Sequence, residues 1–73
     1  MVGKLKKVYS LRKNIWRVHF EPDENGIIKG VFVDINDSYQ LKETDNNKEV
    51  EIITTYISEV GGLPFKYAKI KLI

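Results

Sequence analysis

Residues 14–20 have the sequence NIWRVHF, and the alternation in this stretch decides the fold. Trp16, Val18 and Phe20 fall on one side of an extended chain. Arg17 and His19 fall on the other side, which is the period of a half-buried β-strand. We therefore predict a strand that buries Trp16 in the core and leaves His19 at least partly exposed to solvent.

A turn signal follows this strand at once. Residues 21–26, EPDENG, end in an Asn-Gly pair, and residues 27–35 then place Val31, Val33 and Ile35 on a common face. Two alternating segments joined by such a turn predict an antiparallel hairpin whose apolar faces share one core.

One further strand is predicted clearly at the C-terminus, and two shorter segments are weaker candidates. Residues 65–73 place Ala68, Ile70 and Leu72 on one face and charged or aromatic residues on the other. Residues 5–11 and 38–42 are weaker strand candidates, because their alternation is incomplete.

Residues 50–60 carry two conflicting signals. Val50, Ile53 and Ile57 have helical spacing, and Gly61 stands where a helix would end. The unbroken run of β-branched and aromatic residues over 52–57 favours a strand instead. We predict the strand, with apolar groups on both faces and hence a central position or a covered outer face.

The chain has 73 residues, which suffices for one small core, so we expect residues 1–73 to form a single small domain. The predicted fold is mainly β, a small five-stranded antiparallel barrel of SH3-like or OB-like type, because closure limits exposed edges in a short chain. The alternative is an α+β fold with a helix at 47–60.

Several classes of function are disfavoured by composition. The sequence has no cysteine and no long apolar run, so we expect an intracellular, cytoplasmic protein without disulfides, thiolate metal sites or a membrane span. His19 is the only histidine, and neither a metal-ligand spacing nor a catalytic motif accompanies it. We expect no enzymatic activity, no metal and no cofactor.

Charge is segregated along the chain although the net charge is only +2. Residues 1–20 carry +6 and residues 60–73 carry +3, whereas residues 21–59 carry −7. If the terminal strands were neighbours in the sheet, one side of the barrel would be basic and the other acidic.

This segregation leads to the first functional hypothesis, a non-catalytic module that binds DNA or RNA. Lysines and arginines on the terminal strands would contact phosphates, and tyrosines between them would stack on unpaired bases. The candidate residues are Lys6, Lys7, Tyr9, Arg12, Arg17, Tyr67, Lys69 and Lys71.

The alternative hypothesis is a small protein-interaction or inhibitor module, of the kind found in phages or mobile elements. A polarised small domain of this type would dock on a larger protein of complementary charge. The sequence does not choose between these two classes of partner.

Overall fold

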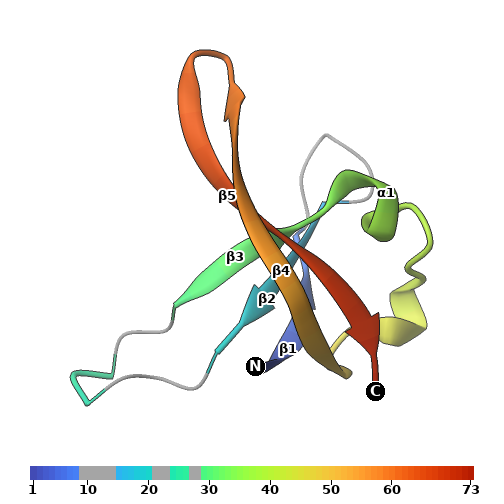
Figure 1. The fold of residues 1–73 in the computed structure, drawn as a ribbon. Helices are drawn as coiled ribbons and strands as arrows, with labels where there is room; N and C mark the ends of the chain where they lie inside the picture. Colours follow the sequence, from blue (N-terminus) through green and yellow to red (C-terminus); the bar gives the residue numbers. More distant parts are fainter. Residues whose placement is uncertain (9–14, 21–23, 27–28) are drawn as a thin grey trace.

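The computed structural model describes residues 1–8, 15–20, 24–26 and 29–73. In the described residues, the strands are β1 (Val2–Lys7), β2 (Trp16–His19), β3 (Gly30–Val33), β4 (Glu49–Val60) and β5 (Leu63–Leu72). A short helix, α1 (Ile35–Ser38), and a 3-10 turn, η1 (Glu43–Asp45), lie between β3 and β4 (Figure 1).

The strands form a closed barrel in the order β1-β2-β3-β5-β4, and β4 returns to pair with β1. The predicted mainly-β, five-stranded barrel is confirmed. The pair β3–β5 is parallel, and the other strand pairs of the described barrel are antiparallel. The barrel is therefore mixed and not wholly antiparallel as predicted, and it contains one short helix between β3 and β4.

The core lies inside this barrel, and the predicted hairpin contributes most of it. Leu5 and Val18 are fully buried, and Trp16 is only 2% exposed. Val18 pairs with Val31, as the alternation of the hairpin predicted. Among the described residues, the buried core consists of Leu5, Trp16, Val18, Val31, Val33, Val50 and Ala68, and the side chains of Phe20, Leu41, Ile52 and Ile70 pack against it.

A long hairpin projects from the barrel (Figure 1). β4 and β5 pair along their length up to Val60 and Leu63, and Gly61 and Gly62 form the turn with positive φ angles of 60° and 80°. A two-residue turn with positive φ at both positions matches the right-handed twist of a hairpin. The strand prediction for residues 50–60 is therefore confirmed, and the helix alternative is wrong.

A β-bulge interrupts β4 between Ile52 and Thr54. Such an extra residue bends the strand and exchanges the two faces beyond it. On the barrel side of the bulge, β4 pairs with β1. On the other side the hairpin extends outward, where Ile53 is 63% exposed and Ile57 is 71% exposed. The expected cover over these two side chains is absent from the described part of the chain.

The segment after β3 also departs from the prediction. Asp34 caps α1, its Oδ1 accepting hydrogen bonds from the backbone N–H groups of Asn36 and Asp37. This cap starts a helix at Ile35, so Ile35 leaves the predicted strand face and is 55% exposed. The strand predicted at 38–42 is wrong, because those residues complete the helix and the turn that follows it.

One carboxylate connects this segment to the barrel, and a second closes the turn around η1. Asp37 Oδ2 accepts a hydrogen bond from the backbone N–H of Ile70 at 3.0 Å, beyond the last residue of the β3–β5 ladder. The buried Asp45 accepts hydrogen bonds from the backbone N–H of Lys42 at 2.8 Å and from Lys48 Nζ at 2.9 Å.

The described chain contains no helix with the length and apolar character needed to cross a bilayer.

Candidate nucleic-acid interface

One cross-strand row runs across the outside of the barrel. Lys6 pairs with Arg17, and Arg17 pairs with Phe32. Phe32 pairs with Tyr67, and Tyr67 pairs with Tyr56. Each strand of the barrel thus contributes one residue, and two cationic side chains are followed by three aromatic ones. We call these five residues the outer row.

The outer row faces away from the core because its residues alternate with buried ones. Arg17 lies between the buried Trp16 and Val18, and Phe32 lies between Val31 and Val33. Successive side chains of a strand point to opposite faces of the sheet. Arg17, Phe32 and Tyr67 are half-buried, so their flat surfaces are partly available from solvent.

The row is held together by contacts between rings. The Arg17 guanidinium carbon lies 4.8 Å from the centroid of the Phe32 ring, a distance at which a cation and an aromatic face attract each other. The Phe32 and Tyr67 centroids are 5.9 Å apart, and those of Tyr67 and Tyr56 are 5.7 Å apart with nearly parallel planes. Phe65 meets Phe32 edge to face at 5.9 Å.

The far end of the row is anchored by a carboxylate. The Tyr56 hydroxyl donates a hydrogen bond of 2.5 Å to Oδ2 of Asp34, the residue that caps α1. This bond raises the pKa of Tyr56 to about 12, with burial as a smaller cause. The same bond is the main reason that the pKa of Asp34 lies below its ordinary value. Tyr56 is therefore fixed against Tyr67 and not free to rotate.

His19 lies one pleat along β2 from Arg17 and is opposite Lys4 on β1. Partial burial lowers its pKa below the usual 6.5, and the nearby charges of Arg17 and Lys6 lower it further. The cationic end of the row thus has a positive potential strong enough to disfavour another positive charge.

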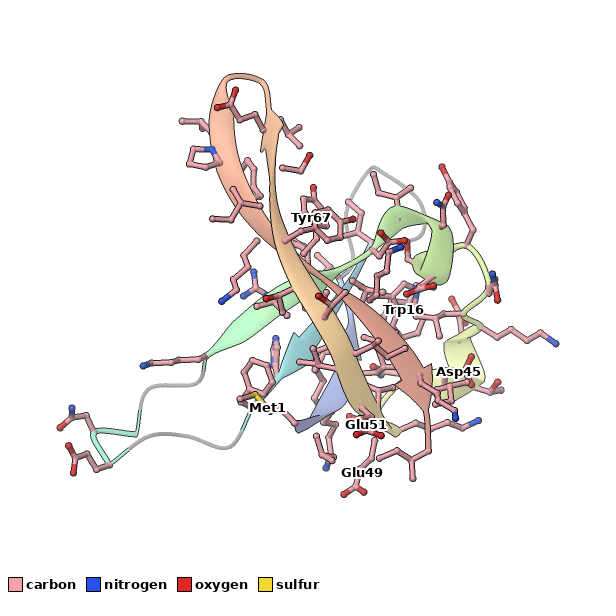
Figure 2. The ribbon with its side chains drawn as sticks, in the orientation of Figure 1. Met1, Trp16, Asp45, Glu49, Glu51 and Tyr67 are labelled. Carbon is pink, nitrogen blue, oxygen red and sulfur yellow. The ribbon has the colours of Figure 1, made fainter. Side chains whose placement is uncertain are left out.

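The structure brings only some of the predicted site residues together. Lys6, Arg17 and Tyr67 belong to the outer row, where Tyr67 lies at the base of the projecting hairpin (Figure 2). Lys69 and Lys71 follow Tyr67 on the same face of β5, Lys69 near Asp34 and Lys71 opposite Glu51.

The remaining candidates lie elsewhere. Lys7 alternates to the opposite face of β1, where its Nζ lies 2.6 Å from Glu43 Oε1. This ion pair is the main cause of the lowered pKa of Glu43. Tyr9 and Arg12 lie outside the described residues.

The terminal strands are not neighbours, contrary to the arrangement considered for the sequence. β4 separates β1 from β5 on one side of the barrel, and β2 and β3 separate them on the other. The basic ends are linked instead through Arg17 and Phe32 on the β2–β3 side.

Sequence reasoning missed two members of the row. Phe32 had a usable signal, since it alternates with Val31 and Val33 and must therefore point outward if they point inward. Tyr56 had none, because simple alternation places it on the same face as Ile52. Only the bulge at Ile53 moves it to the outside.

A pocket adjoins the aromatic half of the row. It has a volume of about 430 Å³ and lies between β3, α1 and the hairpin, which lines the pocket from Tyr67 to Val60 beside the turn. Phe32 and Tyr67 belong to both the row and the pocket wall.

Across the residues that the structure describes, no three histidine, aspartate or glutamate side chains gather as a metal site would require.

Comparisons with known proteins give no match for this chain among family models, curated proteins or solved structures.

Proposed function

We propose that the protein is a non-catalytic nucleic-acid-binding module that holds a single strand of DNA or RNA across the outer face of the barrel. The observation that carries this proposal is the outer row itself, in which Lys6 and Arg17 continue into Phe32, Tyr67 and Tyr56. Cations that contact phosphates beside rings that stack on bases are the usual means of binding single strands.

The shape of the face supports a single strand over a duplex. Three rings follow one another at centroid spacings of 5.7 to 5.9 Å, so they form a continuous apolar strip and not an isolated ring. Stacking on this strip requires bases that are not already stacked in a helix. The positive end of the strip supplies the phosphate contacts that dominate affinity.

The charged residues around the outer row favour one orientation of the bound strand. Lys4 extends the cationic end of the row, and Lys69 follows Tyr67 on the same face of β5. The backbone of the strand would follow these groups, and its bases would lie over Phe32 and Tyr67. We expect this binding to take place in the cytoplasm, since a chain without cysteine suits a reducing compartment.

The test uses a fluorescently labelled single strand of about 12 nucleotides, within the length that small barrels of this type cover. Arg17→Gln removes the cation at the centre of the outer row. Lys42→Gln is the matched control, because it also removes one positive charge but from the exposed residue before η1. We expect Arg17→Gln to weaken binding several-fold and to reduce the salt slope by about 0.7, the value for one phosphate contact in a single strand. Lys42→Gln is expected to change neither quantity.

If the two substitutions weakened binding equally, the interface would not be localised at the outer row, and general electrostatic attraction would account for the binding. Melting curves of both variants provide the control, because binding lost through unfolding would be accompanied by a lower melting temperature.

A second candidate function, docking on a larger protein, is favoured by the projecting hairpin. Ile53, Ile57 and Leu63 are each more than 60% exposed there. β4 is paired with β1 only over Glu49 to Glu51, so one edge of the outer half of β4 has no partner strand in the described chain. Exposed apolar edges are sites of strand addition by a partner. Substituting Ile57 by Lys would abolish such docking and leave oligonucleotide binding intact.

A further inference from the structure

The pocket beside the outer row has the dimensions of a small-molecule site. Its volume of about 430 Å³ falls within the range of pockets that hold drug-sized ligands. Its wall consists mainly of apolar and aromatic side chains, among them Trp16, Phe32, Ile35, Tyr39, Phe65 and Tyr67. Such a wall suits a flat, largely apolar ligand that carries few polar groups.

The ring of Trp16 contributes to the pocket wall, although only 2% of the residue is exposed. Its Nε1 is fully buried and has no hydrogen-bond acceptor among the residues that the structure describes, so a ligand in the pocket contacts the apolar part of the ring and not this donor.

The pocket is continuous with the outer row through two shared side chains. Phe32 and Tyr67 contribute to both, and Arg17 lies over the ring of Phe32. A chain that follows the row with its phosphates at Lys6 and Arg17 therefore passes the pocket with its bases on the aromatic side.

We propose that the pocket receives one unpaired nucleobase of the bound strand, with the ring of the base held between the aromatic walls. This inference rests on the proposed function and specifies how the strand is held. A nucleobase is a flat ring, and it fits a pocket whose wall is mainly apolar and aromatic and which adjoins the cationic end of the outer row. The cations at the row provide complementary charge for the phosphates on either side of that base.

Trp16 makes the proposal directly measurable, because it is the only tryptophan in the chain. Its fluorescence is followed while the full-length protein is titrated with two probes of equal length, a single strand of about 12 nucleotides and the corresponding abasic strand. Both probes carry the same phosphates, and only the first carries bases. Binding itself is measured separately by anisotropy of a label on the probe.

We expect both probes to bind, the base-bearing strand more tightly by about 5- to 150-fold, which corresponds to about 1–3 kcal/mol for one stacked base. Only the base-bearing strand should change the emission of Trp16. If the base-bearing strand binds more tightly than the abasic strand but leaves that emission unchanged, the pocket proposal is overturned while the proposed function stands. If neither strand binds, both are overturned.

A pair of matched variants locates the effect. Val60 lines the pocket, whereas Ile57 lies on the same strand outside the pocket wall. Val60→Phe fills part of the pocket and should reduce the difference in affinity between the base-bearing and abasic strands, and Ile57→Phe should leave that difference unchanged. Equal behaviour of the two variants would count against the pocket. If Val60→Phe fails to fold, the comparison of the two probes on the unaltered protein decides the question.

Discussion

Asp34 connects three parts of the structure, so its removal is the most informative test of the fold that supports the row. One carboxylate oxygen accepts hydrogen bonds from two backbone N–H groups of α1, and the other accepts the hydroxyl of Tyr56. The side chain is 93% buried by its neighbours, since only 7% of the residue is exposed. Asp34→Ala removes all three bonds at once.

The expected cost follows from these contacts. Loss of the helix cap costs about 1 kcal/mol. The hydrogen bond from Tyr56 to a charged acceptor is worth about 1.5 kcal/mol at the low end, the appropriate value because Tyr56 is partly exposed to water. The total of about 2–3 kcal/mol is a large part of the roughly 4–11 kcal/mol expected for a chain of this length. At about 4–8 °C per kcal/mol, the melting temperature should fall by about 8–24 °C.

The assay is thermal melting followed by circular dichroism, with Asn36→Ala as control because the Asn36 side chain is exposed on the same helix. Asp34→Asn adds a second measurement, since it keeps a cap but removes the negative charge. In this variant the pKa of Tyr56 should return from about 12 toward 10, which spectrophotometric titration of the tyrosines detects. The reasoning would be refuted if Asp34→Ala lowered the melting temperature no more than Asn36→Ala does. It would also be refuted if the pKa of Tyr56 stayed at about 12 in Asp34→Asn.

Further predictions concern the core and the cationic end of the row. Gly3→Ala should lower the stability by about 1–3 kcal/mol in a denaturant titration, because the new Cβ would lie 2.3 Å from Cγ1 of the buried Val18 and overpack the core; an unchanged midpoint would show that β1 can shift freely. The lowered pKa of His19 means that the unfolded chain takes up a proton first as the pH falls below 6.5, so this group should reduce folding stability there. A bound phosphate would instead raise that pKa, so oligonucleotide affinity should increase as the pH falls below 6.5, and His19→Gln should remove the increase; a His19→Gln variant with the same pH profile would exclude His19 from the interface.

Much of the barrel could be predicted because alternation in short strands directly reports burial. Trp16 and Val18 are buried where the pattern places them, and the pairing of Val18 with Val31 follows from the same period. The conflict over residues 50–60 was decided correctly by side-chain shape. β-branched residues fit a pleated strand better than a helix interior, whatever their spacing.

The errors have local causes that act over one or two residues. Asp34 diverts the chain into α1, which removes Ile35 from its predicted face and abolishes the strand at 38–42. The bulge at Ile53 exchanges the faces of β4 and brings Tyr56 beside Tyr67. A cap and a bulge depend on single hydrogen bonds formed in the folded state, so periodicity alone does not reveal them.

Only part of the candidate site could be predicted from the sequence, for a related reason. Its cations were evident as charge on the terminal segments, but their grouping depends on strand order. Lys7 is removed from the face by alternation and bonded to Glu43, whereas Arg17 becomes central because β2 lies between β1 and β3. The outer row arises from the strand order and the pairing register of the barrel, and the amino-acid composition carries no information about either.

The salt dependence of single-strand binding by the unaltered protein tests the central claim most directly. Three or four phosphates near Lys4, Lys6, Arg17 and Lys69 predict that the logarithm of the binding constant falls with the logarithm of salt concentration with a slope of about −2 to −3. The titration should cover about 50 to about 200 mM salt. Absence of measurable binding at the lowest salt, or an affinity independent of salt, would contradict the assignment of the outer row as a nucleic-acid interface.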